Sequence, residues 1–339
     1  MKTSDFDYHL PLEYIAQTPI EPRHASRLLV LNRSQRKLEH SIFWNLGSYL
    51  QPGDLLVINQ TRVLPARLFA KKTTGGRVEI LLLRQIDELT WEALGGGKGL
   101  RAGRHLQVEN GPGVEIIEVL EGPKRLVRFA EPIEAFLDSA GEMPLPPYIH
   151  TKLEDPERYQ TVYASTPGSA AAPTAGLHFT PELMARLGEI GIRFAHVTLH
   201  VGLDTFAPVT EENVKDHKIH TEWCEVPEQT VQAVNSTREA GKRVIAVGTT
   251  SVRTIESAAR SASGSDVVTR FSGFTDLFIT PGYEFKVVDA MITNFHLPRS
   301  TLLMLVSAFA GHELILETYQ RAVESGYRFY SFGDAMLIV

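Results

Sequence analysis

The sequence predicts an α/β protein whose larger domain is interrupted by a block of short strands. After this block, apolar strand-like runs alternate with helical segments, which is the element order of a sheet covered by helices. From Val63 to about Tyr148, short apolar runs are separated by Gly-Gly, Asn-Gly-Pro-Gly and Glu-Gly-Pro, a spacing typical of a small antiparallel barrel or sandwich. The length of 339 residues leaves room for two domains. We therefore interpret the block as an insertion into the α/β domain.

The composition, 43% hydrophobic and 22% charged with a net charge of −6, is that of a soluble globular protein. The negative charge argues against a protein that coats nucleic acid through bulk charge. Between Leu55 and Asn110 there are nevertheless nine Lys/Arg and only five Asp/Glu. A local basic patch in this region can therefore still bind nucleic acid. The single cysteine, Cys224, excludes an internal disulfide and an all-cysteine zinc or iron–sulfur site within one chain.

No targeting or membrane segment is expected. The N-terminal residues lack an apolar signal core, which predicts a cytoplasmic location. The most apolar run, Leu302–Ala310, is far shorter than the roughly 20 residues that span a bilayer, so it predicts a core helix and no membrane association.

The N-terminal and inserted segments predict short elements. We expect a short helix over Leu12–Gln17 and strands over Leu28–Leu31 and Leu55–Asn59. In the insertion, the expected strands and their following helix are Val78–Leu83, His105–Val108, Val114–Leu120, Leu126–Phe129 and Pro132–Ala140. The run Gly95-Gly96-Gly97-Lys98-Gly99 lacks the Gly-Lys-Ser/Thr ending and the helix of a phosphate loop, which favours a flexible hairpin loop.

A histidine-rich stretch follows the insertion. The run Thr180-Pro181-Glu182 predicts a helix start, with threonine as N-cap and proline at the first helical position, and Gly191 predicts its end. The next strand has two different faces. Its apolar and polar positions are Val197, Leu199, Val201 and His196, Thr198, His200. One apolar face and one His/Thr face indicate a sheet that borders a cleft.

The C-terminal half continues the alternation of helices and strands. The expected elements are helices Pro227–Ala240, Val252–Ala259, Leu302–Ala310 and Leu314–Glu324, with strands Arg243–Val247 and Val287–Asn294. Ser251 is the expected N-cap of its helix. Because the loop Gly248-Thr249-Thr250-Ser251 joins a strand's carboxyl end to a helix N-terminus, it predicts a binding place for a carboxylate or phosphate.

Candidate chemical groups concentrate in one run, which places Asp216, His217, His220 and Glu222 within seven residues. His217, His220 and Glu222 suggest a zinc site, but no other ligand pair has the proper spacing, and a polar network at a domain joint is the simpler interpretation. A Ser/His/Asp hydrolase is disfavoured because the chain has no G-x-S-x-G elbow.

Three further histidines lie at element ends, where catalytic side chains usually lie: His178, His200 and His296. Arg62 and Arg67 are either solvated loop charges or phosphate contacts. Composition and spacing alone thus reach an α/β enzyme with a histidine-rich, metal-free cleft.

Long motifs carry a family resemblance. The runs A-A-P-T-A-G-L-H-F-T, T-L-H-V-G-L-D-T-F-A-P-V, A-V-G-T-T-S-V-R-T-I-E-S, T-N-F-H-L-P-R-S-T-L-L-M-L-V-S-A-F-A-G and Y-R-F-Y-S-F-G-D-A-M-L-I stand in this chain. The chain resembles the S-adenosylmethionine:tRNA ribosyltransferase-isomerase family of queuosine biosynthesis over essentially its whole length. Asp204 and the run W-E-A-L-G-G-G-K-G-L-R depart from the family pattern.

The resemblance implies transfer and isomerisation of the ribosyl part of S-adenosylmethionine onto 7-aminomethyl-7-deazaguanine at the tRNA wobble position. The products would be epoxyqueuosine-tRNA, adenine and methionine. S-adenosylmethionine is then a consumed substrate, and no cofactor or metal is expected. The resemblance also implies a mixed α/β, barrel-like main domain, residues 1–62 and 149–339, with an inserted small antiparallel β-barrel, residues 63–148. The expected protein is a monomer in the cytoplasm.

The resemblance also assigns expected roles. The proton-transfer candidates are His178, His200, Asp216, His217, His220 and Glu222. The substrate-binding candidates are Thr174, Gly176, Thr249, Thr250, Arg253, Asn294 and His296. The tRNA-binding candidates are Arg62, Arg67 and Lys98. Two rival functions remain, a small-molecule adenosyl hydrolase and an RNA-binding module without catalysis.

Overall fold

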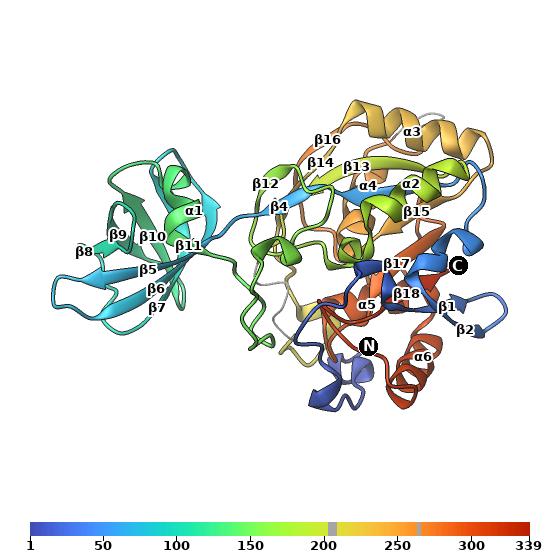
Figure 1. Ribbon diagram of the computed structural model, residues 1–339, viewed down its shortest axis with the longest axis horizontal. Coiled ribbons are helices and arrows are strands. Elements are labelled where there is room, and N and C mark those ends of the chain that lie inside the picture. The colour runs from blue at the N-terminus through green and yellow to red at the C-terminus, as the bar shows by residue number, and fades with distance from the viewer. Residues whose placement is uncertain (203–208, 263–265) are drawn as a thin grey trace. The chain divides into compact units, whose positions relative to one another are not determined.

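The computed structural model describes residues 1–202, 209–262 and 266–339. Two compact units divide the chain. The first comprises Met1–Thr61, Pro147–Thr166 and Ala172–Val339, and the second comprises Arg62–Pro146 and Pro167–Ala171 (Figure 1). The segment Pro167–Ala171, which the sequence analysis assigned to the main domain, therefore belongs to the second unit.

A nine-stranded mixed sheet forms the centre of the first unit. Its strands, in spatial order, are β16 (Phe271–Thr275), β14 (Glu222–Val226), β13 (Arg193–Leu199), β3 (Leu55–Asn59), β15 (Val244–Val247), β17 (Ala290–Asn294), β18 (Ala335–Ile338), β1 (Arg27–Asn32) and β2 (Lys37–Ile42). The four strands β13, β3, β15 and β17 run parallel. The resemblance implies a barrel-like main domain. Within the described residues its sheet is open, with β16 and β2 as the two edge strands.

Both faces of this sheet are covered. Along β3, Leu55 and Val57 face one apolar cluster and Leu56 and Ile58 face the other. Helices α3 (Glu228–Glu239), α4 (Thr249–Arg260), α5 (Thr301–Ala310) and α6 (His312–Glu324) contribute to the first cluster, and α2 (Pro181–Glu189) contributes to the second. Figure 1 shows α3 running alongside β13. Because both faces are buried, the central strands are continuous apolar runs instead of alternating ones.

Short 3₁₀ turns complete the first unit. They are η1 (Thr3–Phe6), η2 (Leu12–Tyr14), η3 (Arg23–Ala25), η4 (Phe43–Tyr49), η6 (Pro156–Tyr159), η7 (Thr174–His178) and η9 (Val214–Asp216). The helix expected over Leu12–Gln17 is thus a single 3₁₀ turn.

Helix starts were predicted with mixed success. Thr180 caps α2 as predicted, because its side chain accepts a hydrogen bond from the Leu183 backbone N–H. The predicted Ser251 cap of α4 is wrong. The helix begins at Thr249, after Gly248 with φ of 87°, and the Ser251 hydroxyl donates back to the Val247 carbonyl at 2.8 Å. Serine inside a helix satisfies its hydroxyl in this way.

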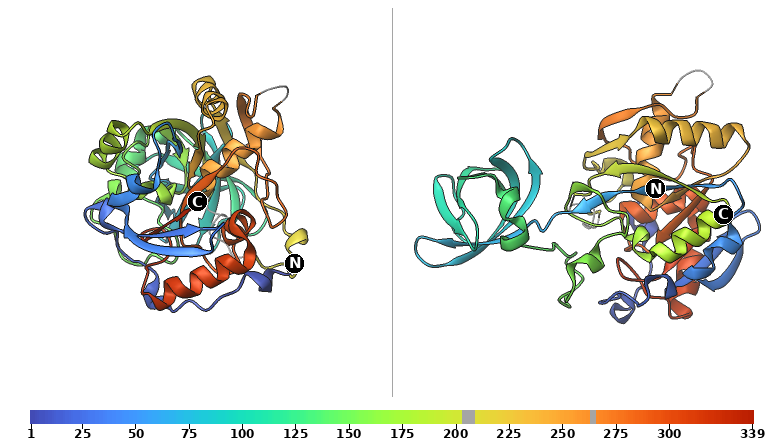
Figure 2. Two further views of the ribbon diagram at one scale, coloured as in Figure 1. Left: turned by 90° about the vertical axis from the view of Figure 1, so that its right-hand side faces the viewer. Right: turned by 45° about the horizontal axis from the view of Figure 1, so that its top comes forward.

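A closed antiparallel barrel forms the second unit (Figure 2). Its strands, in order, are β5 (Arg67–Lys72), β6 (Arg77–Gln85), β7 (Thr90–Gly96), β10 (Lys124–Phe129), β9 (Gly113–Val119) and β8 (Arg104–Val108). Pairing of β8 with β5 closes the ring, so the barrel is confirmed over the sandwich. Gly95 and Gly96, expected in a loop, end β7 as paired strand residues.

Short elements flank this barrel. They are η5 (Ile133–Phe136), α1 (Leu137–Ala140), β11 (Gly141–Glu142), and the pair of β4 (Thr61–Val63) with β12 (Thr166–Ser169). The predicted fold class, a mixed α/β main domain with an inserted antiparallel β-barrel, is confirmed. No single helix of the described residues is long and apolar enough to cross a membrane; α5 and α6, bent by 113° at their junction, pass that test only as a pair.

Candidate active site

A cleft lies at the carboxyl ends of the parallel strands, all of its described lining residues belonging to the first unit. Residues that follow β13, β15 and β17 line it, represented by Val201, Thr249 and His296. Its volume is about 670 Å³, including space open to solvent. Ligands of open α/β sheets bind at this edge because loops and helix N-termini converge there.

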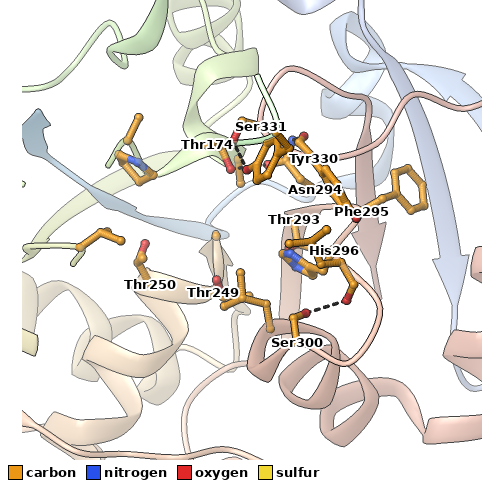
Figure 3. Close-up of a pocket in the computed structure, with 18 residues that line it drawn as sticks. Thr174, Thr249, Thr250, Thr293, Asn294, Phe295, His296, Ser300, Tyr330 and Ser331 are labelled. Atoms are coloured by element: carbon orange, nitrogen blue, oxygen red, sulfur yellow. Dashed lines mark hydrogen bonds between the residues drawn. The ribbon is translucent and has the colours of Figure 1, made fainter. Parts of the chain in front are cut away.

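The N-terminus of α4 forms one wall of the cleft. Gly248 follows β15 and has φ of 87°, a left-handed conformation that glycine adopts without steric cost. Thr249 and Thr250 follow and line the cleft (Figure 3). The first backbone N–H groups of a helix have no partner within the helix, and the helix dipole favours an anion beside them. This wall therefore suits a carboxylate, as the sequence predicts.

The end of β17 supplies the opposite wall. His296 is 8% exposed and its Nε2 lies 2.7 Å from the Thr293 hydroxyl. Burial lowers the pKa of His296 to about 3. The imidazole is therefore neutral near pH 7. It is the one histidine among the described residues that line the cleft.

Asn294 joins this wall to the turn η7. Its Oδ1 accepts a hydrogen bond from the Thr174 hydroxyl at 3.0 Å, and its Nδ2 lies 3.2 Å from His178 Nε2. Thr174 and Asn294 line the cleft, whereas His178 is 4% exposed and lies behind them, in a smaller cavity with Arg23.

Gly176, expected to contact substrate, has a packing role in the structure. A Cβ at this position would lie 2.0 Å from the Tyr163 hydroxyl oxygen, so only glycine fits the turn.

Aromatic side chains at the cleft were missed by the sequence analysis. Tyr148 and Tyr330 line it with ring centroids 4.8 Å apart, and the Tyr148 hydroxyl lies 2.8 Å from the Ser331 hydroxyl. Burial raises the pKa of both tyrosines, so both stay protonated at neutral pH. Tyr330, a non-glycine residue with φ of 70°, belongs to the run Y-R-F-Y-S-F. This run connects α6 to β18 and has neither helical nor strand periodicity, so the sequence pattern could not single out Tyr330.

Glu222 and Arg253 form a buried ion pair near the cleft. Arg253 Nη1 donates to Glu222 Oε2, and Arg253 Nε donates to the Leu277 carbonyl at 3.1 Å. Glu222 Oε1 accepts from the Gly202 backbone N–H at 2.9 Å, directly after the cleft residue Val201. Neither member of the pair is among the described lining residues, so the pair supports the cleft wall from behind.

The rest of the Asp216–Glu222 run lies in other contacts. Asp216 is exposed and accepts from the Asn213 side-chain amide at 3.0 Å. His217 Nδ1 lies 3.0 Å from Glu211 Oε2. His220 is exposed. The members of this run therefore contact different partners, and its proton-transfer role stays a prediction.

His200 lies at the end of β13 beside an aromatic neighbour. Its ring stacks on Trp223 with centroids 5.2 Å apart, and its Nδ1 lies 2.8 Å from the Thr61 hydroxyl. Burial lowers its pKa, so the ring is neutral at physiological pH. Asp204, the departure from the family pattern, lies outside the described residues.

The tRNA-binding candidates belong to the second unit. Arg67 Nε lies 3.1 Å from Glu79 Oε1 in a half-exposed ion pair. Lys98 is exposed, and its backbone carbonyl accepts from the Lys72 ammonium. Arg62 is half-buried. Within the described ranges of both units, no three His, Cys, Asp or Glu side chains are arranged to hold a metal ion.

An α/β sheet with a polar and aromatic cleft at its carboxyl edge, carrying an inserted barrel, defines a ligand-binding α/β protein. A family model described as "Queuosine biosynthesis protein" matches residues 3–338. The chain belongs to this queuosine biosynthesis family.

Curated relatives of the chain are enzymes named S-adenosylmethionine:tRNA ribosyltransferase-isomerase. Those of Dehalococcoides mccartyi and Thermotoga maritima are 54% and 52% identical to it, each over 100% of both chains. The crystal structure of S-adenosylmethionine tRNA ribosyltransferase from Thermotoga maritima is 41% identical with a TM-score of 0.58, covering 99% of this chain and 100% of that one. The family resemblance stated from the motifs is confirmed.

Proposed function

We propose that the chain transfers and isomerises the ribosyl moiety of S-adenosylmethionine onto 7-aminomethyl-7-deazaguanine at the tRNA wobble position. Epoxyqueuosine-tRNA, adenine and methionine are the products. The names of full-length relatives support this reaction. The observation that carries it is the cleft, which combines a helix N-terminus for a carboxylate with aromatic and hydroxyl walls for a nucleoside.

The cleft suggests how S-adenosylmethionine lies. Its carboxylate meets the N-terminus of α4 at Thr249 and Thr250. Its adenosyl part packs against aromatic side chains such as Tyr148 and Tyr330. Arg253, also a substrate-binding candidate, acts from behind through Glu222.

The reaction consists of proton transfers and charge stabilisation. The sulfonium acidifies the C5′ protons of the ribosyl group, so a positioned base removes one and initiates loss of adenine. The substrate amine loses a proton before it attacks C1′, departing adenine gains one, and methionine leaves as the epoxide closes. Neutral histidines suit these transfers, and His178, His200, Asp216, His217, His220 and Glu222 remain the candidates. His296 joins them because it lines the cleft.

The second unit holds the tRNA in this proposal. Arg62, Arg67 and Lys98 contact phosphates, and the target base leaves its stack to be reached by the enzyme. We further propose that the protein acts as a cytoplasmic monomer, without membrane association and without a metal or other cofactor.

Incubation with S-adenosylmethionine labelled in adenine, with and without tRNA that carries 7-aminomethyl-7-deazaguanine, tests the function. Release of adenine only when this tRNA is present supports the transferase. Release without tRNA supports an adenosyl hydrolase. Binding of tRNA with no release in either case supports a binding module.

A further inference from the structure

Thr174 stands at the end of a buried chain of hydrogen bonds that runs away from the cleft. Its hydroxyl donates to Asn294 Oδ1 at 3.0 Å, Asn294 Nδ2 lies 3.2 Å from His178 Nε2, and His178 Nδ1 lies 2.8 Å from the Ser26 hydroxyl. Figure 3 shows Thr174, Asn294 and Tyr330 gathered on one side of the cleft. Of these four residues, Thr174 and Asn294 line the cleft, and His178 and Ser26 do not.

The donors and acceptors of this chain can be assigned one by one. Asn294 Nδ2 also donates to the Tyr330 carbonyl at 3.1 Å, which can only accept, so the amide orientation is determined. The second hydrogen of the same nitrogen then points to His178 Nε2, which must accept. The single hydrogen of neutral His178 therefore lies on Nδ1 and is donated to Ser26.

The Thr174 hydroxyl is the end of this hydrogen-bonded chain that lies at the cleft. Thr174 has one hydroxyl hydrogen, and Asn294 Oδ1 takes it. The lone pairs of Thr174 Oγ1 are what remains for a ligand, so Thr174 can only accept a hydrogen bond from it.

The surroundings of His178 keep it in the required state. The side chain is 4% exposed, and its ring lies 5.0 Å from the Phe43 ring, centroid to centroid. Burial, together with the positive charges of Arg328 and Arg23, lowers its pKa to about 3. The ring is therefore neutral near pH 7, and in the tautomer that its hydrogen-bond partners select, Nε2 accepts from Asn294.

We propose that His178 is a positioning residue that, together with the Tyr330 carbonyl, holds the Asn294 amide so that Thr174 is the acceptor for an amino or hydroxyl donor of the substrate. The identity of that substrate rests on the proposed function. S-adenosylmethionine carries several such donors, namely the adenine amino group, the ribose hydroxyls and the ammonium group. A site that offers only an acceptor at this point rejects a ligand that presents an acceptor there, because two lone pairs would face each other.

A double-mutant cycle on S-adenosylmethionine binding tests the proposal. Thr174→Val and His178→Leu should each weaken binding about ten-fold by calorimetry, the usual worth of one hydrogen bond. If His178 acts through Thr174, the double variant should also be about ten-fold weaker. A double variant about 100-fold weaker, the product of the single effects, overturns the proposal.

Two matched variants separate positioning from general loss of structure. His178→Gln offers an amide oxygen near the position of Nε2, so it should restore binding to within about three-fold of the original chain. His40 is an exposed histidine of the same unit whose Nδ1 lies 2.8 Å from the Tyr327 hydroxyl, and it is not among the lining residues. His40→Leu should leave S-adenosylmethionine binding unchanged. Equal weakening in His178→Gln and His178→Leu contradicts the proposal.

A ligand-free measurement distinguishes this proposal from the proposed function. Nitrogen-15 NMR of the unaltered full-length protein reports which ring nitrogen of His178 carries hydrogen. Hydrogen on Nδ1 supports the assignment even where the variants do not fold, and hydrogen on Nε2 overturns it. A protein that binds S-adenosylmethionine but releases no adenine with tRNA fails the proposed function, while the binding cycle still decides the role of His178.

Discussion

Glu222 and Arg253, 31 residues apart in the chain, form an ion pair in which both side chains are less than 10% exposed. The glutamate also accepts the backbone N–H of Gly202, and the arginine also donates to the Leu277 carbonyl. One pair thus ties β14, α4 and two connecting segments together behind the cleft. A buried pair of this kind is sensitive to loss of one partner, because the other charge is then left without compensation.

Removal of one partner should therefore destabilise the fold. We expect Arg253→Ala to lower the free energy of unfolding by about 3–5 kcal/mol, as for other broken buried pairs. Urea unfolding followed by circular dichroism measures this loss. As control, Asp216→Asn on an exposed turn should change stability by no more than about 0.5 kcal/mol. A similar small change for Arg253→Ala would contradict a structural role for the pair.

The proton-transfer prediction for the Asp216–Glu222 run is tested by rate. At least one of Asp216→Asn, His217→Gln, His220→Gln and Glu222→Gln should cut single-turnover adenine release about 10²- to 10⁴-fold, the usual worth of general acid–base catalysis. The melting temperature and both substrate affinities of that variant should stay close to those of the original chain. Measurement from pH 5 to 9 gives the profile. If all four variants fold and react at normal rates, the next candidates for the chemistry are His178, His200 and His296.

The pH dependence of stability should report the buried His296. Its pKa is lowered to about 3 in the folded protein from an ordinary value of 6.5. Between pH 6.5 and 3 the unfolded chain therefore binds a proton at this histidine that the folded protein does not bind. The contribution of His296 to the free energy of unfolding is fully present above pH 6.5 and is lost as pH falls toward 3. We expect up to about 1.4 kcal/mol of lost stability per pH unit from this group.

Comparison of variants isolates that contribution. Urea unfolding at pH 7, 6, 5 and 4 should show a shallower loss of stability for His296→Asn than for the original chain. The exposed His105→Asn on the barrel is the control and should keep the original slope. An unchanged slope in His296→Asn would show that this imidazole is not held neutral.

The barrel candidates predict a salt-dependent effect on tRNA alone. Reversing Arg62 and Arg67 to glutamate should weaken tRNA binding and reduce the slope of log K against log salt by about one per lost phosphate contact. S-adenosylmethionine affinity should be nearly unaffected. Filter binding at several salt concentrations checks this, with the exposed Lys37→Glu of β2 as a control. An unchanged slope excludes both arginines as phosphate contacts.

Metal independence is a separate prediction. Because no convincing ligand set was found in the sequence, turnover should survive dialysis against a strong chelator. Adenine release with tRNA before and after dialysis is the measurement. Complete loss of turnover, restored by zinc alone, would contradict the prediction, and manganese or magnesium additions serve as comparison.

Local patterns in the sequence determined the elements that depend on local chemistry. The run Leu55–Asn59 forms β3 with the predicted bounds, because four consecutive apolar residues between a turn and a polar segment have few alternatives. Thr180 caps α2 because threonine followed by proline suits a helix start in any surroundings. The family and the reaction class followed from long uninterrupted motifs.

Only the tertiary structure decided which polar residues meet. The sequence grouped Asp216, His217 and Glu222 because they are neighbours, yet Glu222 pairs with Arg253 and His217 contacts Glu211. His178 and Asn294 are 116 residues apart and are in hydrogen-bond contact. Pairing of β5 with β8 selected a barrel over a sandwich. The physical reason is that hydrogen bonds and ion pairs depend on distances in space, which strand order and sheet register determine and which periodicity along one segment does not encode.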